Sequence, residues 1–301
     1  MKNNFRPQDS FLPGTTSTLI LVDWSNLLYR AWFVSREQPW VAFCKFFDML
    51  RLCVHKSKQP GVPTHIIFCG ESRTRLKRCD IFPEYKGTRK SSKNEEFAKF
   101  RKTLEVYIHN LGYDLLRVDG AEADDVIASI VAANCHRCYC TVPCGNCKHA
   151  QEFTTDVVIF SGDKYLLQLL AWKRVLIYRA PGLFIDAAMF KEEFGIPVEK
   201  YNIYKALIGD KSDNIAGVNG FGPVKARIAI NANTVAEDIW ESGGGEAADE
   251  FKLALSLVNL DTKLDVNLND IYTGLPLVDK VPESLNRLVL LEIKRFREEF
   301  D

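Results

Sequence analysis

Short apolar runs alternate with longer segments of mixed polarity along most of the chain. The apolar runs predict buried strands at residues 18–22, 65–69, 115–118, 156–161 and 174–178. The intervening segments at residues 40–56, 97–111 and 165–170 predict helices. Strands that alternate with helices predict a mostly parallel sheet with helices on both faces, so we expect an α/β fold.

The two ends of the chain follow a different pattern. Residues 1–17 are rich in Pro, Asn, Gly, Ser and Thr and predict a flexible tail. Residues 186–232 predict helices joined by loops, and residues 247–260 and 284–300 predict amphipathic helices that pack on the main body. The glycines at 243–245 predict a flexible break before the first of these two helices.

Acidic residues stand where the predicted strands end. Three of them follow a strand, and three more crowd into the first turn of the helix predicted after residues 115–118. Because the carboxyl ends of parallel strands share one edge of a sheet, we expect a cation site whose oxygen ligands suit Mg²⁺ or Mn²⁺ better than Zn²⁺. The alternatives are an acidic turn that only stabilises its helix, and Asp23 as a helix N-cap. The acids are Asp23, Glu71, Glu122, Asp124, Asp125 and Asp163.

Residues 73–90 carry a local excess of positive charge, with seven basic residues against two acids. The aromatic residues Phe82 and Tyr85 lie among them. Basic side chains neutralise phosphates and an aromatic ring can stack on an unpaired base, so the segment predicts a nucleic-acid contact. The alternative is a basic loop that only faces water. The basic residues are Arg73, Arg75, Lys77, Arg78, Lys86, Arg89 and Lys90.

A cysteine-rich insert occupies residues 135–149. It contains two C-x-x-C pairs, Cys135 with Cys138 and Cys144 with Cys147. Each pair can supply two thiolates, so the insert predicts one structural Zn²⁺ in tetrahedral geometry, which elemental analysis of the reduced protein can check. The alternative is a reduced loop without metal.

A glycine-rich turn follows two further acids, Asp210 and Asp213. The turn runs from Gly217 through Gly220 to Gly222, and Pro223 suits the first turn of the helix that it opens. Backbone N–H groups at such a junction bind phosphate oxygens, and Lys225 and Arg227 add positive charge. The alternative is a tight connection between two helices.

The composition narrows the classes of protein that fit these patterns. With 47% hydrophobic and 26% charged residues, the 301-residue chain is ordinary for a globular protein of one large or two small domains. The net charge is zero, so any nucleic-acid signal must be local. We see no span for a bilayer and no secretory signal, so we expect a cytoplasmic protein without disulfides. Five histidines and no evident Ser/His or Cys/His pair argue against nucleophilic catalysis.

Taken in order, these motifs resemble the 5′-nuclease (flap endonuclease) superfamily. The similarity covers roughly residues 18–260 and is greatest to stand-alone bacteriophage 5′→3′ exonucleases and to the 5′-nuclease domain of bacterial DNA polymerase I. The matching motifs are Asp23, Glu71, Arg78, Pro83–Arg89, Glu122–Asp125, Ser161–Asp163, Gly209–Asn214 and Gly217–Gly222.

The resemblance implies a PIN-like domain over residues 18–185, with a helical arch at about 73–103 and the insert at 135–149. It implies a helical DNA-binding domain over residues 186–301 with a helix–three-turn–helix element. The implied activity is Mg²⁺-dependent hydrolysis of phosphodiester bonds, leaving a 5′-phosphate, in branched or 5′-ended DNA and in the RNA of primer hybrids.

The resemblance also implies roles for single residues. The first metal would be held by Asp23, Glu71, Glu122, Asp124 and Asp125, and the second by Asp163, Asp210 and Asp213. Lys86 and Arg89 in the arch would contact the scissile phosphate, Arg78 would bind DNA, and Tyr85 would stack on a flipped terminal base. The turn with Gly217, Gly220 and Gly222, together with Lys225 and Arg227, would grip the duplex, with a K⁺ ion. We expect a monomer that works with replication proteins.

Two positions depart from the family pattern. Glu71 stands where the family usually has Asp, and Tyr165 stands where Asp is common. The second change removes a carboxylate from the second metal site, so a rival hypothesis is a branched-DNA-binding protein with weak or no catalysis. A PIN-type ribonuclease is a third hypothesis, and the duplex-gripping turn argues against it.

Overall fold

The computed structural model describes residues 14–88, 94–113, 115–134, 154–179 and 182–266. These residues contain a six-stranded sheet with the order β3-β2-β1-β4-β5-β6. All neighbouring strands are parallel except β6, which runs antiparallel to β5. The predicted α/β fold is therefore confirmed. The strands are β1 (Ser17–Asp23), β2 (Thr64–Cys69), β3 (Leu115–Leu116), β4 (Thr155–Phe160), β5 (Val175–Arg179) and β6 (Leu183–Ile185).

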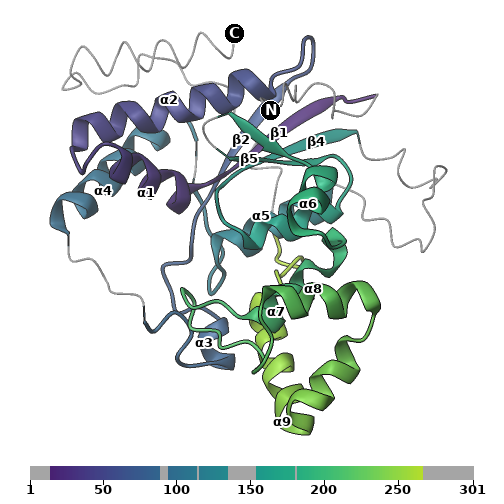
Figure 1. Ribbon diagram of the computed structural model, residues 1–301. Coiled ribbons are helices and arrows are strands. Elements are labelled where there is room, and N and C mark those ends of the chain that lie inside the picture. Colours follow the sequence, from purple (N-terminus) through teal and green to yellow (C-terminus); the bar gives the residue numbers. More distant parts are fainter. Residues whose placement is uncertain (1–13, 89–93, 114, 135–153, 180–181, 267–301) are drawn as a thin grey trace.

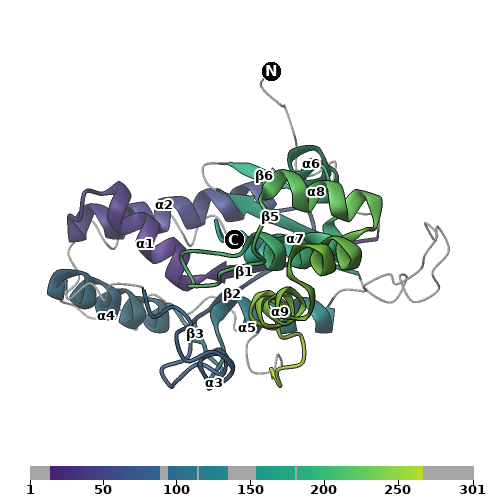
Figure 2. The same ribbon diagram turned by 60° about the horizontal axis from the view of Figure 1, so that its bottom comes forward.

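Helices cover both faces of the sheet (Figure 1). One group packs on the first face and consists of α1 (Trp24–Val34), α2 (Pro39–Ser57) and α4 (Glu95–Asn110). A larger group packs on the second face, and Figure 2 shows the two groups on opposite sides of the strands. The second group is α5 (Ala123–Asn134), η3 (Tyr165–Ala171), α6 (Ala187–Phe194), η4 (Val198–Lys200), α7 (Tyr201–Ile208), α8 (Pro223–Ala232) and α9 (Val235–Val258). A short helix, α3 (Arg78–Ile81), lies in the loop after β2.

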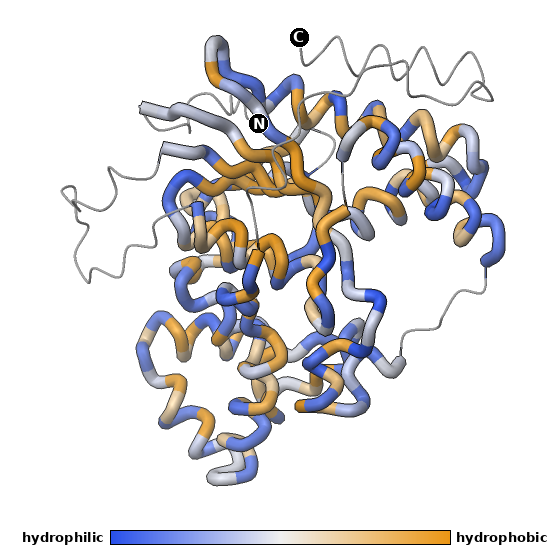
Figure 3. Tube along the Cα trace, turned by 180° about the vertical axis from the view of Figure 1, so that it is seen from behind, coloured by the Kyte–Doolittle hydropathy of each residue, from blue (hydrophilic) through white to orange (hydrophobic). Residues whose placement is uncertain are grey.

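The apolar runs form strands because both faces of each strand are buried. In β1, Leu19 and Leu21 join the core beneath α5, whereas Ile20 and Val22 join the core beneath α1 and α2. Alternate side chains of a strand point to opposite faces, so a strand covered on both sides reads as a continuous apolar run. Figure 3 shows this apolar centre between polar outer surfaces. Burying each such side chain contributes roughly 1.5–3 kcal/mol.

Two predicted boundaries and the type of one predicted helix differ from the structure. The predicted tail reaches too far, because Ser17 already belongs to β1 and the Thr16 N–H donates to the Thr154 carbonyl at 2.9 Å. The strand predicted at 115–118 ends at Leu116 in this structure. The helix predicted at 165–170 is present as the 3₁₀-helix η3.

The glycines at 243–245 break the helical geometry of α9 at the predicted position. Gly243 and Gly244 have non-helical backbone angles, so α9 consists of two helical parts joined across a kink. Glycine tolerates this geometry because it has no Cβ. The helix predicted at 284–300 lies outside the described residues.

The helices after β6 share a core with the sheet. Phe190 of α6, Leu207 of α7 and Ile230 of α8 belong to the same apolar cluster as Leu19 of β1. The proposed boundary at residue 185 therefore divides a continuous core. Among the helices of the described ranges, none has the length and apolar content needed to cross a membrane.

Candidate active site

Carboxylates from separate parts of the sequence line one pocket at the carboxyl edge of the sheet. The pocket has a volume of about 510 Å³ and also contains Lys86. Asp23 ends β1, and the other carboxylates follow β2, follow β4 or begin α5. Parallel strands bring these ends together, as the sequence predicts. The lining carboxylates are Asp23, Glu71, Glu122, Asp124 and Asp163.

Asp23 both caps a helix and faces the pocket. Its Oδ1 accepts the Asn26 N–H at 3.0 Å, so the N-cap alternative is true, and its Oδ2 accepts the Ser161 hydroxyl at 2.7 Å. Burial raises the pKa of Asp23 to about 6, and the negative charges of Asp163 and Glu71 act in the same direction. One residue thus fixes the start of α1 and carries a carboxylate into a crowded acidic site.

Asp124 is the most crowded of these carboxylates. Burial, followed by the charges of Asp163 and Asp23, raises its pKa well above the ordinary value. The negative charges of these carboxylates repel one another. A divalent cation bound among their oxygens would offset this repulsion and make the cluster favourable.

The donor set fits a hydrated ion. In the part of the chain that the structure describes, no three His, Cys, Asp or Glu side chains already surround one point at ligand distance. Mg²⁺ commonly keeps several waters and binds through one or two carboxylates, so it needs no such cage. The described residues that line the pocket offer carboxylate oxygens and include no His or Cys, so the lining fits Mg²⁺ or Mn²⁺.

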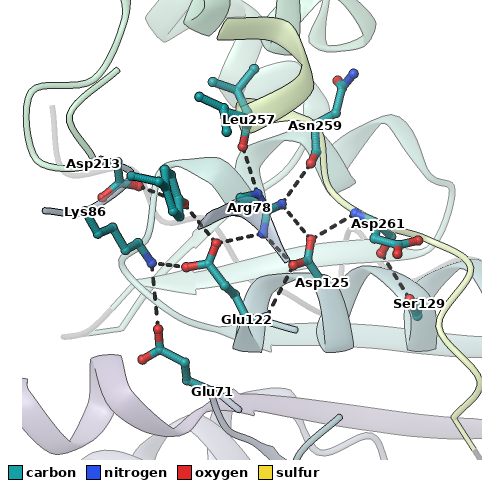
Figure 4. A network of polar contacts seen from close by, with 12 residues as sticks. Glu71, Arg78, Lys86, Glu122, Asp125, Ser129, Asp213, Leu257, Asn259 and Asp261 are labelled. Atoms are coloured by element: carbon teal, nitrogen blue, oxygen red, sulfur yellow. Dashed lines mark hydrogen bonds and ion pairs between the residues drawn. The ribbon is translucent and has the colours of Figure 1, made fainter. Parts of the chain in front are cut away.

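Lys86 partly neutralises the acidic pocket (Figure 4). Its Nζ forms an ion pair with Glu122 and lies 4.0 Å from Glu71 Oε1. The Lys86 backbone has a φ of 56°, which is uncommon for a residue with a Cβ, and its N–H donates to the Asp213 carbonyl at 3.0 Å. The fold therefore holds one ammonium group among the carboxylates, where a phosphate can reach it.

Arg78 is buried and binds acids instead of facing solvent. Its guanidinium donates to Glu122 and Asp125, each at 2.7 Å, and to the carbonyls of Leu257 and Asn259 (Figure 4). Both Asp125 oxygens are engaged by Arg78, and Asp125 does not line the pocket. Asp125 therefore pairs with Arg78 instead of facing the predicted metal site, and Arg78 is not exposed for a DNA contact. Both predictions are corrected in this way.

Tyr85 is also buried, which corrects its predicted role. Only 6% of it is exposed, and its hydroxyl donates to Glu122 at 2.8 Å, so it presents no face for a nucleotide base. Two aromatic residues, Tyr29 and Phe97, line the pocket; Tyr29 is 45% exposed, and its ring stacks on that of Phe97 with the ring centres 4.6 Å apart. Tyr29 was not among the residues predicted from the sequence. The pocket-lining residues of α1 include positions 25, 26, 29 and 30, which recur with helical spacing. This spacing is the sequence signal that places Tyr29 on the same helix face as residues 25 and 26.

Asp210 and Asp213 do not line the pocket. Burial acts to raise the pKa of Asp210, but hydrogen bonds from Lys205 and Ser212 lower it to about 2. Asp213 is only 2% exposed. Tyr165 is buried near both acids, whose charges add to burial in raising its pKa, and Lys205 Nζ lies 5.0 Å from the centre of its ring. An aromatic ring and an ammonium group thus occupy the region expected to hold a second metal.

The glycine-rich turn between α7 and α8 has the predicted form. Gly217 and Gly209 pack backbone to backbone, because a Cβ on Gly217 would lie 2.5 Å from the Gly209 nitrogen. Gly222 is the N-cap of α8 and Pro223 is at its first turn, so the helix begins at the exposed end of the turn. Lys225 is exposed beside it. This end of α8 presents backbone N–H groups and positive charge to solvent.

Arg227 lies in α8 and is half-buried. Five other predicted residues lie outside the described ranges, namely Arg89 in the arch and the four cysteines Cys135, Cys138, Cys144 and Cys147. Their predicted roles stay predictions.

A family model described as "5′-3′ exonuclease, N-terminal resolvase-like domain" matches residues 18–195. The chain belongs to this 5′-3′ exonuclease family. A 5′-3′ exonuclease of Aquifex aeolicus (strain VF5) is 28% identical over 94% of this chain and 95% of its own length. DNA polymerase I of Pseudomonas aeruginosa is 32% identical over 68% of this chain, which corresponds to 21% of that longer protein.

Solved structures of 5′-exonucleases share the fold. The T5 5′-exonuclease with divalent metal ions (zinc) bound has a TM-score of 0.59 and 20% identity, covering 94% of this chain and 100% of that one. A T5 flap endonuclease complex with DNA and metal ions has the same TM-score and identity. Membership of the 5′-3′ exonuclease family and this shared fold agree with the resemblance drawn from the motifs.

Proposed function

We propose that the chain is a metal-dependent, structure-selective 5′→3′ exonuclease and flap endonuclease that hydrolyses phosphodiester bonds of DNA. The observation that carries the proposal is the pocket in which five carboxylates from four parts of the chain line the same space as Lys86. Its place at the carboxyl edge of the sheet in a member of the 5′-3′ exonuclease family supports the same conclusion.

The pocket residues would have separate roles in hydrolysis. Asp23, Glu71, Asp124 and Asp163 would hold Mg²⁺ or Mn²⁺, the second ion more weakly than the first. A bound ion supplies Lewis acidity and an activated water at neutral pH. Lys86 would leave its carboxylate partners to bind the scissile phosphate, because the non-bridging oxygens of a phosphodiester carry negative charge and accept hydrogen bonds from an ammonium group.

The substrate would extend to either side of the pocket. Tyr29 would stack on a base, which makes this contact tolerant of sequence. The N-terminal end of α8, with Gly220, Gly222, Lys225 and Arg227, would bind the duplex backbone, with K⁺ as a bridging ion. Such contacts suit branched or 5′-ended DNA and primer hybrids handled by a monomer during replication or repair.

A flap assay tests the proposed function. We expect cleavage of a 5′-flap duplex with Mg²⁺ and none with EDTA. Binding of the flap duplex without cleavage in Mg²⁺ or Mn²⁺ would favour a branched-DNA-binding protein. The buried Tyr165 and Lys205 support this alternative. Cleavage of unstructured RNA alone would favour a PIN-type ribonuclease.

Replacing Tyr165 by Asp is expected to strengthen the second metal site. The change adds a carboxylate near Asp163, Asp210 and Asp213, so half-maximal activity should need less Mg²⁺, and Mn²⁺ titration followed by electron paramagnetic resonance should show tighter binding.

Tyr165→Asn is the matched control for this change. It removes the same ring from the buried cluster with Tyr85 and Leu257 but adds no charge. Both variants should lose stability, whereas only Tyr165→Asp should shift the metal curves. Identical metal curves for wild type and Tyr165→Asp would rule out a weakened second site.

A further inference from the structure

A second pocket adjoins the catalytic pocket on the side of β3. Its volume is about 890 Å³, within the range of roughly 300–1,000 Å³ found for ligand sites. Ser25, Glu71 and Arg101 line both pockets, so the two pockets are neighbours. The second pocket, called here the basic pocket, is otherwise lined mainly by α4, by Arg73 after β2 and by Arg117 after β3.

The charge of the basic pocket is opposite to that of the catalytic pocket. Arg73, Arg101, Lys102 and Arg117 line it against the two carboxylates Glu71 and Glu105. Glu105 holds two of the cations in place, because it accepts from Arg73 at 3.0 Å and from Arg117 at 2.6 Å. In the described part of the chain, no carboxylate forms an ion pair with Arg101 or Lys102.

Arg101 and Lys102 point to the kind of ligand that the basic pocket would accept. Both line it, and within the described ranges neither has a carboxylate ion-pair partner. Cationic side chains of this kind bind phosphate oxygens, so they indicate an anionic ligand that carries oxygen atoms.

The sheet order fixes which part of a DNA strand would reach the basic pocket. Helix α7, which leads into the duplex-binding turn, packs on η3 after β4, whereas the basic pocket lies toward β3 at the opposite edge of the sheet. A DNA strand that crosses the carboxylates at the ends of β1 and β4 would therefore have its duplex part on the side of η3. Its 5′ part would lie on the side of β3, at the basic pocket.

We infer that the basic pocket binds the phosphate that lies one nucleotide to the 5′ side of the scissile bond. The inference rests on the proposed function, since it places the scissile phosphate in the catalytic pocket. At a recessed 5′ end this group is the terminal 5′-phosphate, and in a flap it is an internal phosphate of the displaced strand. The pocket would thus make the enzyme distinguish a 5′-phosphate from a 5′-hydroxyl end.

The experiment compares one duplex with a 5′-phosphate and the same duplex with a 5′-hydroxyl. For wild type we expect the 5′-phosphate to lower KM about 10-fold with little change in kcat. The double variant Arg73→Ala/Lys102→Ala should lose this preference. Binding measured in EDTA should show the same pattern, with a salt slope for the 5′-phosphate duplex that is smaller by about 1 to 2 in the variant.

Arg75→Ala/Lys99→Ala is the matched control. It removes the same charge from the same loop and the same helix, but neither residue lines either pocket. The control should keep the preference for the 5′-phosphate. An unchanged preference in Arg73→Ala/Lys102→Ala, or an equal loss in both variants, would overturn the inference. If wild type cleaves neither duplex, the proposed function fails, and the binding comparison in EDTA still decides the role of the basic pocket.

Discussion

Replacing Asp124 by Asn is expected to lower the rate of flap cleavage at least about 10³-fold. Asp124 lies where the other pocket carboxylates crowd it, so a cation bound there depends on its charge. A metal ion supplies several kcal/mol of transition-state stabilisation, and about 4 kcal/mol corresponds to a factor of roughly 10³. Single-turnover cleavage of a 5′-flap duplex in Mg²⁺ measures the loss.

The same variant should still fold and bind DNA. Asn keeps the shape of Asp and removes one charge from a crowded acidic set, so flap binding in EDTA should be as tight as that of wild type or tighter. Asp119→Asn is the control, because Asp119 is an exposed acid in the turn before α5 and does not line the pocket. Cleavage by Asp124→Asn within tenfold of wild type would remove this residue from the catalytic site.

Replacing Arg78 by Met is expected to lower the free energy of unfolding by about 3–5 kcal/mol. Arg78 is 9% exposed, and its loss would leave Glu122 and Asp125 as buried charges without their main partner. Removing one partner of a buried ion pair costs this much because the other charge stays desolvated. A domain is stable by only about 5–15 kcal/mol, so urea denaturation should show the change clearly.

Two further variants test whether the loss of stability comes from the buried charges that Arg78 neutralises. Arg75→Ala removes an exposed arginine that pairs with Asp80 on the surface, and it should change stability by less than about 0.5–1 kcal/mol. The triple variant Arg78→Met/Glu122→Gln/Asp125→Asn should recover part of the loss, because it removes the unpaired charges. Arg78→Met within 1 kcal/mol of wild type would contradict the importance assigned to this network.

The arrangement of the strands follows from the sequence, and so does the position of most acids. Runs such as residues 19–22 and 157–160 are apolar throughout, a pattern typical of strands that are covered on both faces. Parallel pairing of those strands then brings Asp23 and Asp163 to one edge without any information on side-chain contacts. Strand β6 has three residues, too few to show a period, and it was missed.

The direction of individual charged side chains does not follow from the sequence. Arg73, Arg75 and Arg78 belong to one basic run, yet Arg78 is buried against Asp125 while Arg75 pairs with Asp80 on the surface. These arginines lie in a loop without regular helical or strand periodicity. Their spacing therefore does not indicate which side chain is buried and which is exposed. Tyr85 is buried because distant residues such as Asp213 and Leu257 meet it, and contacts across such sequence separations leave no local signal.

The central claim is that the pocket lined by Asp23, Asp124 and Asp163 binds a divalent cation. Anomalous diffraction from crystals soaked in Mn²⁺ tests it most directly, because the metal is located without reference to activity. We predict a strong anomalous peak inside this pocket, with oxygen atoms of Asp23 or Asp124 in or next to its coordination shell, and no such peak in Asp124→Asn crystals. A Mn²⁺-soaked crystal with no anomalous peak in the pocket would contradict the account.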